Sequence, residues 1–225
     1  MNGQCLHPRI EVCGGIASGK TSFVVLLSKL RITTGLENFS NNPFLVDFYD
    51  DSPEFAFETE ITFVLQHYNT IKKHAKLRTL AAFDFSLALD LAYAGITLRK
   101  DDRETFDIVY QAVAKKIGLP LLIVRLRCSP DEELLRIRRR ARQVERRIGR
   151  EYLQHLDTAL DRVLASTSFS NTAVLEIDSQ RTDFVTNPAA IVEVCQKIKA
   201  RLDGLGQHVH FDHELVANAA VSPTN

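Results

Sequence analysis

The sequence contains no tryptophan, a single methionine and only four cysteines, Cys5, Cys13, Cys128 and Cys195, which lie far apart. Because no two of them form a CxxC pair, the 225-residue chain indicates neither a disulfide framework nor a zinc site. This cysteine usage is typical of a reducing compartment, and we expect a cytoplasmic protein.

The chain also has no excess of charge and no long apolar run. Its 28 lysines and arginines balance 28 aspartates and glutamates, so no global field steers it onto nucleic acid or an anionic membrane. No apolar run approaches the roughly 18 residues of a membrane span. The opening MNGQCLHPRIEVCGG reaches the first motif too soon for a signal peptide. We therefore expect no nucleic-acid partner, no membrane association, and only local electrostatic function.

An average composition, with 45% apolar and 25% charged residues, predicts one ordinary globular domain. Short apolar runs alternate with longer segments of helical period, which is typical of an α/β domain. The expected strands span residues 9–13, 31–36, 78–83, 121–127 and 173–177. The expected helices span residues 20–30, 53–74, 86–98, 103–117, 130–142, 150–164 and 189–202. We predict a three-layer sandwich around a five-stranded parallel sheet.

The end of the chain differs in composition from the rest. After residue 203 the sequence becomes GLGQHVHFDHELVANAAVSPTN, with little amphipathic period. We predict a domain over residues 1–203 and a flexible tail over residues 204–225. His208, His210 and His213 have a spacing that resembles a metal site, but in a mobile tail we do not expect them to bind metal.

The clearest motif is GGIASGKT, residues 14–21, which fits the pattern G-x-x-x-x-G-K-[ST] between an apolar strand and a helix. Its glycines let backbone N–H groups curl around a phosphate, and the helix N-terminus adds partial positive charge. The lysine reaches the outer phosphates, and the threonine offers a hydroxyl to magnesium. The residues expected to bind ATP here are Gly14, Gly15, Ile16, Ala17, Ser18, Gly19, Lys20 and Thr21. The alternative, a glycine-rich turn without a ligand, is disfavoured by the strand-loop-helix context.

Carboxylates follow two further expected strands, at Glu37 and Asp84. In a parallel sheet both point into the crevice beside the phosphate loop. An Asp in this place is the usual magnesium partner of the loop threonine, here Thr21, while a second carboxylate can accept a hydroxyl proton. Both acids could instead cap helices or solvate loops.

Eight arginines lie between residues 136 and 150. Arg136 and Arg140 are one helical turn apart, so one face of the expected helix can cover phosphates and form a lid. The alternatives are a nucleic-acid patch or a solvated basic face balanced by acids. Those acids are Glu132, Glu133 and Glu145.

The positive charge near the site indicates whether the phosphoryl acceptor is itself phosphorylated, because a phosphorylated acceptor would need an arginine clamp. The first ninety residues contain the loop lysine but only three arginines, Arg9, Arg31 and Arg78, all at expected strand starts, away from the site. The stretch FYDDSPEFAFETE, residues 48–60, offers rings and carboxylates that suit an uncharged nucleoside, although phenylalanines at helical spacing are more often core.

At this point the sequence resembles the deoxynucleoside kinase family, especially its bacterial deoxyadenosine/deoxyguanosine kinase branch, over nearly all of residues 9–200. The resemblance is carried by GGIASGKTS, by residues 36–68, by FDFSLALDLAYA at residues 83–94 and by residues 136–156. It implies a nucleotide-salvage kinase that uses ATP and Mg²⁺ and acts as a homodimer. A thymidylate or other nucleoside monophosphate kinase is the enzymatic alternative.

The resemblance also implies residue roles. Glu37 would accept the proton of the 5′-hydroxyl, and Asp84 would lie beside the magnesium and the 5′-oxygen. The remaining implied contacts are Tyr49 and Glu145 to the sugar 3′-hydroxyl, lid arginines Arg136, Arg140 and Arg142 to phosphate, and Asp183 and Phe184 to the ATP adenine. Lys20, Glu37, Asp84, Arg136 and Arg140 form the expected catalytic set.

Several positions depart from the family pattern. Glu60 and His67 stand where the family presents a glutamine and an arginine to the nucleobase, with Asp90 as the later aspartate. Phe85 replaces an arginine or tyrosine, and Ala141 replaces a glycine in the lid. We expect a slight preference for purines, and a catalytically weak nucleotide-binding relative is the further alternative.

Overall fold

The computed structural model describes residues 7–50, 54–209, 211, 214 and 216–217, and its centre is a parallel β-sheet. The sheet has five strands in the order β2-β3-β1-β4-β5. The strands are β1 (Arg9–Cys13), β2 (Thr33–Gly35), β3 (Ala81–Phe83), β4 (Leu122–Arg127) and β5 (Ala173–Asp178). All pairings are parallel, so every carboxyl end lies at the same edge. The predicted α/β class and five-stranded parallel sheet are confirmed.

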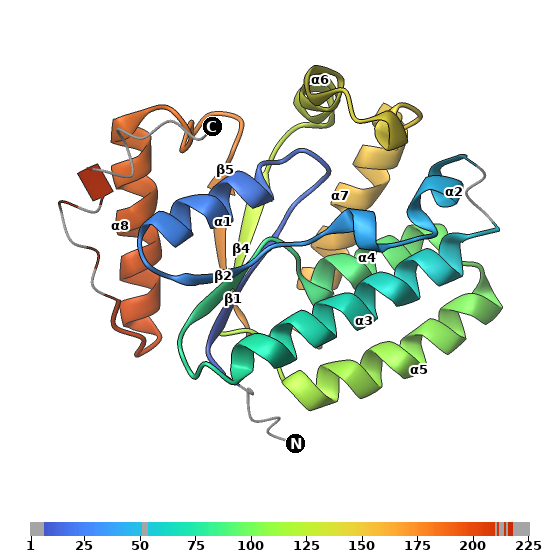
Figure 1. Cartoon of the computed structure of the whole chain (residues 1–225), viewed down its shortest axis with the longest axis horizontal. Helices are drawn as coiled ribbons and strands as arrows, with labels where there is room; N and C mark the ends of the chain where they lie inside the picture. The colour runs from blue at the N-terminus through green and yellow to red at the C-terminus, as the bar shows by residue number, and fades with distance from the viewer. Residues whose placement is uncertain (1–6, 51–53, 210, 212–213, 215, 218–225) are drawn as a thin grey trace.

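Helices cover both faces of the sheet and make three layers (Figure 1). On one face lie α1 (Lys20–Lys29) and α8 (Pro188–Gly204). On the other face lie α3 (Ala56–Ala75), α4 (Leu87–Thr97), α5 (Lys100–Ile117) and α7 (Arg150–Leu164). Shorter elements follow the carboxyl ends of β2 and β4: η1 (Phe39–Asn41), α2 (Leu45–Asp50), α6 (Pro130–Arg140) and η2 (Gln143–Glu145).

Strand β1 is buried throughout and supplies side chains to both faces of the sheet. Ile10 and Val12 pack with α1 and α8, whereas Cys13 packs with α4 and α7. This alternation places the side chains of one strand in both helical layers.

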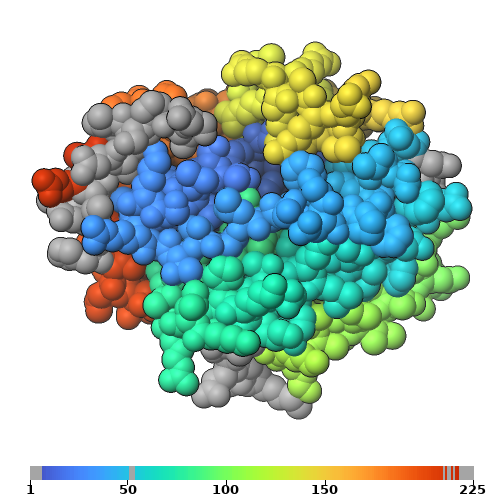
Figure 2. Space-filling model, in the orientation of Figure 1, coloured from blue at the N-terminus to red at the C-terminus, as the bar shows by residue number. Residues whose placement is uncertain are grey.

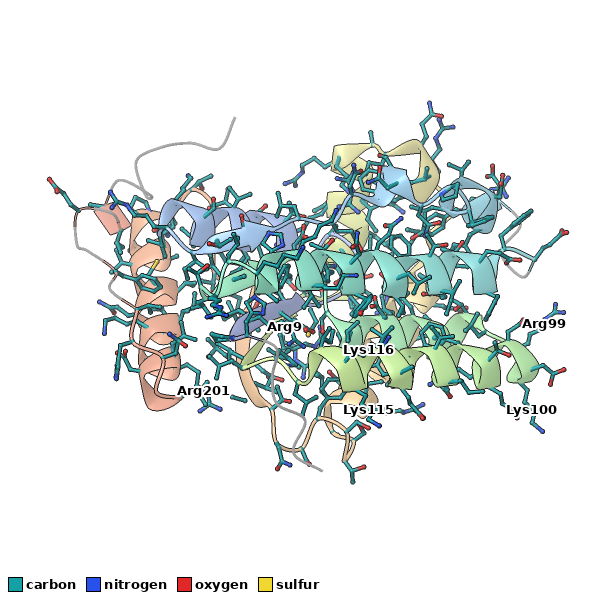
Figure 3. The ribbon with its side chains drawn as sticks, turned by 60° about the horizontal axis from the view of Figure 1, so that its bottom comes forward. Arg9, Arg99, Lys100, Lys115, Lys116 and Arg201 are labelled. Atoms are coloured by element: carbon teal, nitrogen blue, oxygen red, sulfur yellow. The ribbon has the colours of Figure 1, made fainter. Side chains whose placement is uncertain are left out.

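Arg9 is buried at the opposite end of the sheet from the phosphate loop. Its guanidinium bonds Glu11 at 2.8 Å and the backbone oxygens of Ile117 and Gly118 at 3.0 and 2.6 Å. Figure 3 shows Arg9 beside the end of α5 that carries Lys115 and Lys116. The buried charge is thus satisfied and ties the end of α5 to the sheet.

Two strands begin later than the sequence predicts. Arg31 and Arg78, placed in strands by their apolar neighbours, have φ values of 62° and 54° in the left-handed region. A residue in that conformation turns the chain instead of extending it. The strands therefore start at Thr33 and Ala81, two and three residues later.

Helix bounds also differ from the prediction. The helix predicted over residues 130–142 ends at Arg140, because Ala141 adopts the left-handed conformation with φ 52°. Helix α3 starts at Ala56, not at residue 53, which lies outside the described residues, and it is preceded by the unpredicted α2. Helix α5 starts three residues earlier than predicted, and α8 extends to Gly204.

The described part of the C-terminal segment contacts the core. Leu205, Val209 and Phe211 are partly buried against the cluster beneath α8, and Val216 is buried in it. His208 lies within hydrogen-bond distance of Asp203 at 3.2 Å. His210 and His213 lie outside the described residues, so the predicted boundary at residue 204 stays a prediction.

The described cysteines, Cys13, Cys128 and Cys195, are free, and Cys5 lies outside the described residues. Across the described ranges, no helix combines the length and apolar character needed to cross a membrane.

Candidate active site

The phosphate loop joins β1 to α1 and lies at the carboxyl edge of the sheet. The loop lysine, Lys20, donates to the carbonyl oxygens of Gly14 and Gly15 at 3.0 and 2.8 Å, so its ammonium group crosses the mouth of the loop. Gly19 has φ 101° at the start of α1, where a side chain would be strained. The free N–H groups of the first turn of α1 therefore face the position of an anion.

A short chain of hydrogen bonds joins the loop to the two predicted strand-end acids. Thr21 donates its hydroxyl to one oxygen of Asp84 at 2.7 Å, and the backbone N–H of Glu37 donates to the other at 2.6 Å. Burial raises the pKa of Asp84, although these two hydrogen bonds oppose the shift. A hydroxyl and a carboxylate side by side are oxygen donors that suit Mg²⁺, which usually takes one or two protein ligands and completes its shell with phosphate and water.

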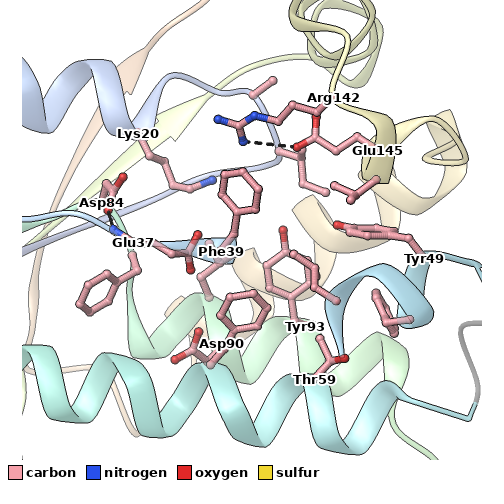
Figure 4. Close-up of a pocket in the computed structure, with 18 of the residues that line it drawn as sticks. Lys20, Glu37, Phe39, Tyr49, Thr59, Asp84, Asp90, Tyr93, Arg142 and Glu145 are labelled. Carbon is pink, nitrogen blue, oxygen red and sulfur yellow. Dashed lines mark hydrogen bonds and ion pairs between the residues drawn. The ribbon is translucent and has the colours of Figure 1, made fainter. Parts of the chain in front are cut away.

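Glu37 points into the pocket below Lys20 (Figure 4). Its carboxylate contacts Nε2 of His67 at 2.8 Å, and Nδ1 of the same ring contacts Asp90 at 2.9 Å. The face of the imidazole lies on Phe85, with ring centroids 4.0 Å apart and planes 4° from parallel. The structure thus brings together residues from the loop after β2, from α3 and from α4.

The charges in this group shift one another's pKa values. Burial alone would raise the pKa of Glu37, but the hydrogen bond and charge of His67, with Lys20, bring it below its usual value. Burial would lower the pKa of His67, but Asp90 and Glu37 raise it to about 10. Burial lowers the pKa of Lys20 despite the nearby acids. Glu37 is therefore ionised at neutral pH, as a proton acceptor must be.

The inner end of the pocket is aromatic, with a few polar groups. Glu60 is buried, and Thr97 donates to it at 3.1 Å. Burial and the charge of Asp90 raise the pKa of Glu60 to about 8. Among the described residues, the buried hydroxyls of Thr59 and Tyr152 have no hydrogen-bond partner. The two hydroxyls are available to a polar ligand in the pocket.

Residues of the arginine-rich segment close the top of the pocket, and Figure 2 shows this segment packed above the phosphate-loop region. Arg140 bonds Glu145 through Nε at 2.7 Å and through Nη2. Arg142 lies 3.6 Å from the same carboxylate and 4.5 Å above the ring of Phe39. Arg136 instead bonds Glu132 and the carbonyl of Ser179 at 2.8 and 2.9 Å, outside the pocket lining.

One pocket contains most of the predicted site residues. Those that line it are Ile16, Ala17, Lys20, Thr21, Glu37, Tyr49, Glu60, His67, Asp84, Asp90, Arg140, Arg142 and Glu145. The pocket therefore places a phosphate loop, a carboxylate and an aromatic chamber in one continuous space.

A comparison with known families decides what this arrangement is. The sequence pattern of the deoxynucleoside kinase family matches residues 10–203, nearly the whole chain. The chain belongs to the deoxynucleoside kinase family. Its α/β fold is the P-loop NTPase fold of that family.

Individual relatives agree with this assignment. The deoxynucleoside kinase described here is 25% identical to a deoxyguanosine kinase of Bacillus subtilis over 199 residues, covering 85% of this chain and 96% of the relative. It is 29% identical to a deoxyadenosine kinase of Dictyostelium discoideum over 165 residues, covering 71% and 67% of the two chains.

A solved structure shows the same fold. It is a deoxyadenosine kinase from M. mycoides with the products dCMP and a flexible dCDP bound. The TM-score is 0.74 at 22% identity, covering 85% of this chain and 99% of the other.

In this deoxynucleoside kinase the predicted adenine-side residues lie outside the pocket lining. Phe184 is buried against Phe23 at 5.3 Å between ring centroids, and a side chain at Gly19 would lie 3.3 Å from it. Asp183 accepts bonds from the backbone of Val185 and Thr186 at 3.0 and 2.9 Å and so orders a turn.

Sequence reasoning missed several lining residues of the kinase pocket. Phe63 lies one turn after Glu60 and one turn before His67 on α3, so helical spacing from those two positions would have found it. Phe39, Tyr93 and Tyr152 come from three separate segments, and only the assembled fold brings them together. Ser18 and Gly14 support the loop from behind and do not line the pocket.

Proposed function

We propose that this chain transfers the γ-phosphoryl group of ATP to the 5′-hydroxyl of a deoxyribonucleoside, with purine deoxynucleosides slightly preferred. The observation that carries the proposal is the single pocket in which Lys20 and Thr21 adjoin Glu37 and then an aromatic chamber. The names of the relatives, deoxyguanosine and deoxyadenosine kinase, support a purine substrate.

Each group has a defined task in this reaction. Lys20 and the amides of residues 14–21 hold the β and γ phosphates, and Glu37 takes the proton of the 5′-hydroxyl. Thr21 and Asp84 would hold Mg²⁺, whose charge neutralises the phosphate oxygens when it is bound. Arg140 and Arg142 close over the transferred group from the lid, and Arg136 fixes the lid helix to the phosphate loop.

The sugar and the base occupy the remaining part of the pocket. Tyr49 and Glu145 line it from α2 and η2 and would orient the 3′-hydroxyl. Burial raises the pKa of Tyr49, so its phenol stays protonated and can donate. Glu60 and Asp90 lie at the base end, among Phe63, Phe85 and Tyr93.

The assay offers each of the four deoxynucleosides, and separately thymidine monophosphate, with γ-labelled ATP. We expect label on deoxynucleosides, most on deoxyadenosine or deoxyguanosine, and none on the monophosphate. Glu37→Gln should lower turnover at least about 100-fold, because proton acceptance is lost. Label only on thymidine monophosphate would show a nucleoside monophosphate kinase instead.

A nucleotide-binding relative without turnover is the second candidate, and Phe85 favours it. This side chain is 2% exposed and stacks on the ring of His67, at a position where many family members have an arginine or a tyrosine. ATP binding without label on any deoxynucleoside would establish this alternative.

We also propose a compartment, a metabolic role and an oligomeric state for the enzyme. We place it in the cytoplasm, in nucleotide salvage, as a homodimer like the family it belongs to.

A further inference from the structure

His67 is the most constrained side chain in the pocket. It is 3% exposed, and each ring nitrogen lies within hydrogen-bond distance of a different carboxylate, Glu37 at 2.8 Å and Asp90 at 2.9 Å. Phe85 stacks on the imidazole with ring centroids 4.0 Å apart, and Phe63 lies beside it at 5.9 Å. Neither the position nor the tilt of the ring is free to change.

The number of protons follows from this geometry. Ionised carboxylates only accept hydrogen bonds, and a neutral imidazole carries one N–H. With both acids ionised, the two bonds from the ring to Glu37 and Asp90 require both nitrogens to carry hydrogen, which is the imidazolium form. The two acids compensate the buried charge, and the flat stack on Phe85 adds a favourable contact between cation and ring.

Both polar atoms of His67 are thus already used within the protein. A side chain that read the nucleobase would need a nitrogen facing the chamber, and this ring has none to spare. Glu60, two turns earlier on α3, is bonded by one hydroxyl, from Thr97, at 3.1 Å and lines the same pocket. Glu60 is therefore better placed to contact a base.

We propose that His67 is a positioning residue for the proton acceptor Glu37 and does not read the nucleobase. The imidazolium fixes one oxygen of Glu37, which leaves the second oxygen for the 5′-hydroxyl, and Asp90 fixes the imidazolium. This inference rests on the proposed function and reassigns a residue that the sequence placed among the nucleobase contacts.

Other charges act on the same group of three residues. They include Lys20 on α1, Glu11 on β1, Asp84 after β3, Glu60 on α3 and Arg142 after α6. The positive charge of His67 therefore interacts with Glu37 and Asp90, whereas Lys20 is left to bind the phosphates.

Steady-state kinetics of two variants on the same helix separate the two roles. His67→Gln should lower kcat by about 10- to 100-fold, the effect expected for losing a hydrogen bond from a charged group. The loss should be equal for all four deoxynucleosides, with KM changed less than about threefold. Glu60→Gln should instead change the ratio of kcat/KM between deoxynucleosides. Lys73→Gln, exposed on the same helix and outside the pocket lining, is the matched control and should leave both unchanged.

Nitrogen NMR of the ligand-free chain provides a second readout that does not depend on turnover, and its main observation is made on the wild type. Both ring nitrogens of His67 should resonate as protonated at pH 8, and Asp90→Asn should lower the pH at which one becomes deprotonated. A neutral ring at pH 7, or a His67→Gln variant that alters base selectivity while keeping kcat, would overturn the inference. If the wild type labels no deoxynucleoside, the proposed function fails, whereas the NMR result still decides the state of His67.

Discussion

At the scale of single residues, Gly15 and Glu133 form an unusual contact behind the phosphate loop. A Cβ atom at Gly15 would clash with the carboxylate of Glu133, so a side chain there would displace that acid from its present position. Glu133 is 3% exposed, and burial raises its pKa to about 8 although Lys20 opposes the shift. The sequence allowed Glu133 to be a solvated acid on a basic helix. In the structure the packing of α6 against the phosphate loop buries it.

The raised pKa of Glu133 predicts a stability that depends on pH. The folded state binds this proton more tightly than the unfolded state does, so the contribution is present at low pH and is lost as pH rises from about 4.5 to about 8. Glu133→Gln removes this loss. We expect its melting temperature to equal that of the wild type near pH 5. At pH 8.5 it should be about 4–8 °C higher, because the wild type has lost a few kcal/mol of its free energy of unfolding.

Calorimetry of both chains between pH 5 and 9 measures this difference. Glu151→Gln, an exposed acid on α7, is the control and should follow the wild type throughout. A difference that is constant with pH would show that Glu133 is ionised in the folded state at all of these values.

At the scale of elements, the accuracy of sequence prediction follows burial. Strand β1 has the predicted bounds and β4 and β5 differ by one residue, because each holds several apolar or β-branched residues within five or six positions. The short strands β2 and β3 and the six-residue α2 carry too few residues for a period to show. Their bounds depend on turns and tertiary contacts that no local pattern records.

Part of the candidate site was also predictable from the sequence. Lys20, Thr21, Glu37 and Asp84 were predictable as neighbours, because parallel strands end at one edge and these residues follow three adjacent strands. The place of His67 was predictable, but its contacts were not. They depend on the relative rotation of α3 and α4, which sequence spacing within one helix does not define.

The end of helix α6 allows a test at this scale. Ala141 terminates the helix with φ 52° and ψ 35°, a left-handed conformation that costs a residue with a Cβ about 1 kcal/mol. Ala141→Gly should therefore raise the melting temperature by about 2–4 °C. The matched control is Ala165→Gly at the end of α7, where φ is −78° and glycine relieves no strain.

Thermal melts at constant pH compare the two variants. Ala165→Gly should be neutral or destabilising by up to about 1 kcal/mol, because glycine adds freedom to the unfolded chain. Equal shifts in both variants would mean that the left-handed turn after α6 carries no strain.

At the scale of the whole molecule, one groove on the surface fits the proposed homodimer. It runs between α4 and α7, and it is lined by small or apolar side chains such as Ile96, Ala159 and Val163 together with the charged Arg103 and Arg162. A net charge of zero means that two copies do not repel each other at long range. Close approach of two such helix pairs would bury the groove of each chain against its copy, which is the self-complementary contact of a two-fold dimer.

Light scattering measures the assembly directly. We expect a mass of twice the 25.4 kDa of one chain. Thr158→Glu puts a charge at an exposed position of the groove and should shift the mass toward one chain, because an unpaired charge buried in an interface is costly. Thr105→Glu, exposed on α5 and outside the groove, should leave the dimer intact. A wild-type mass of one chain would contradict the dimer. A dimer that survives Thr158→Glu would place its interface on another face of the chain.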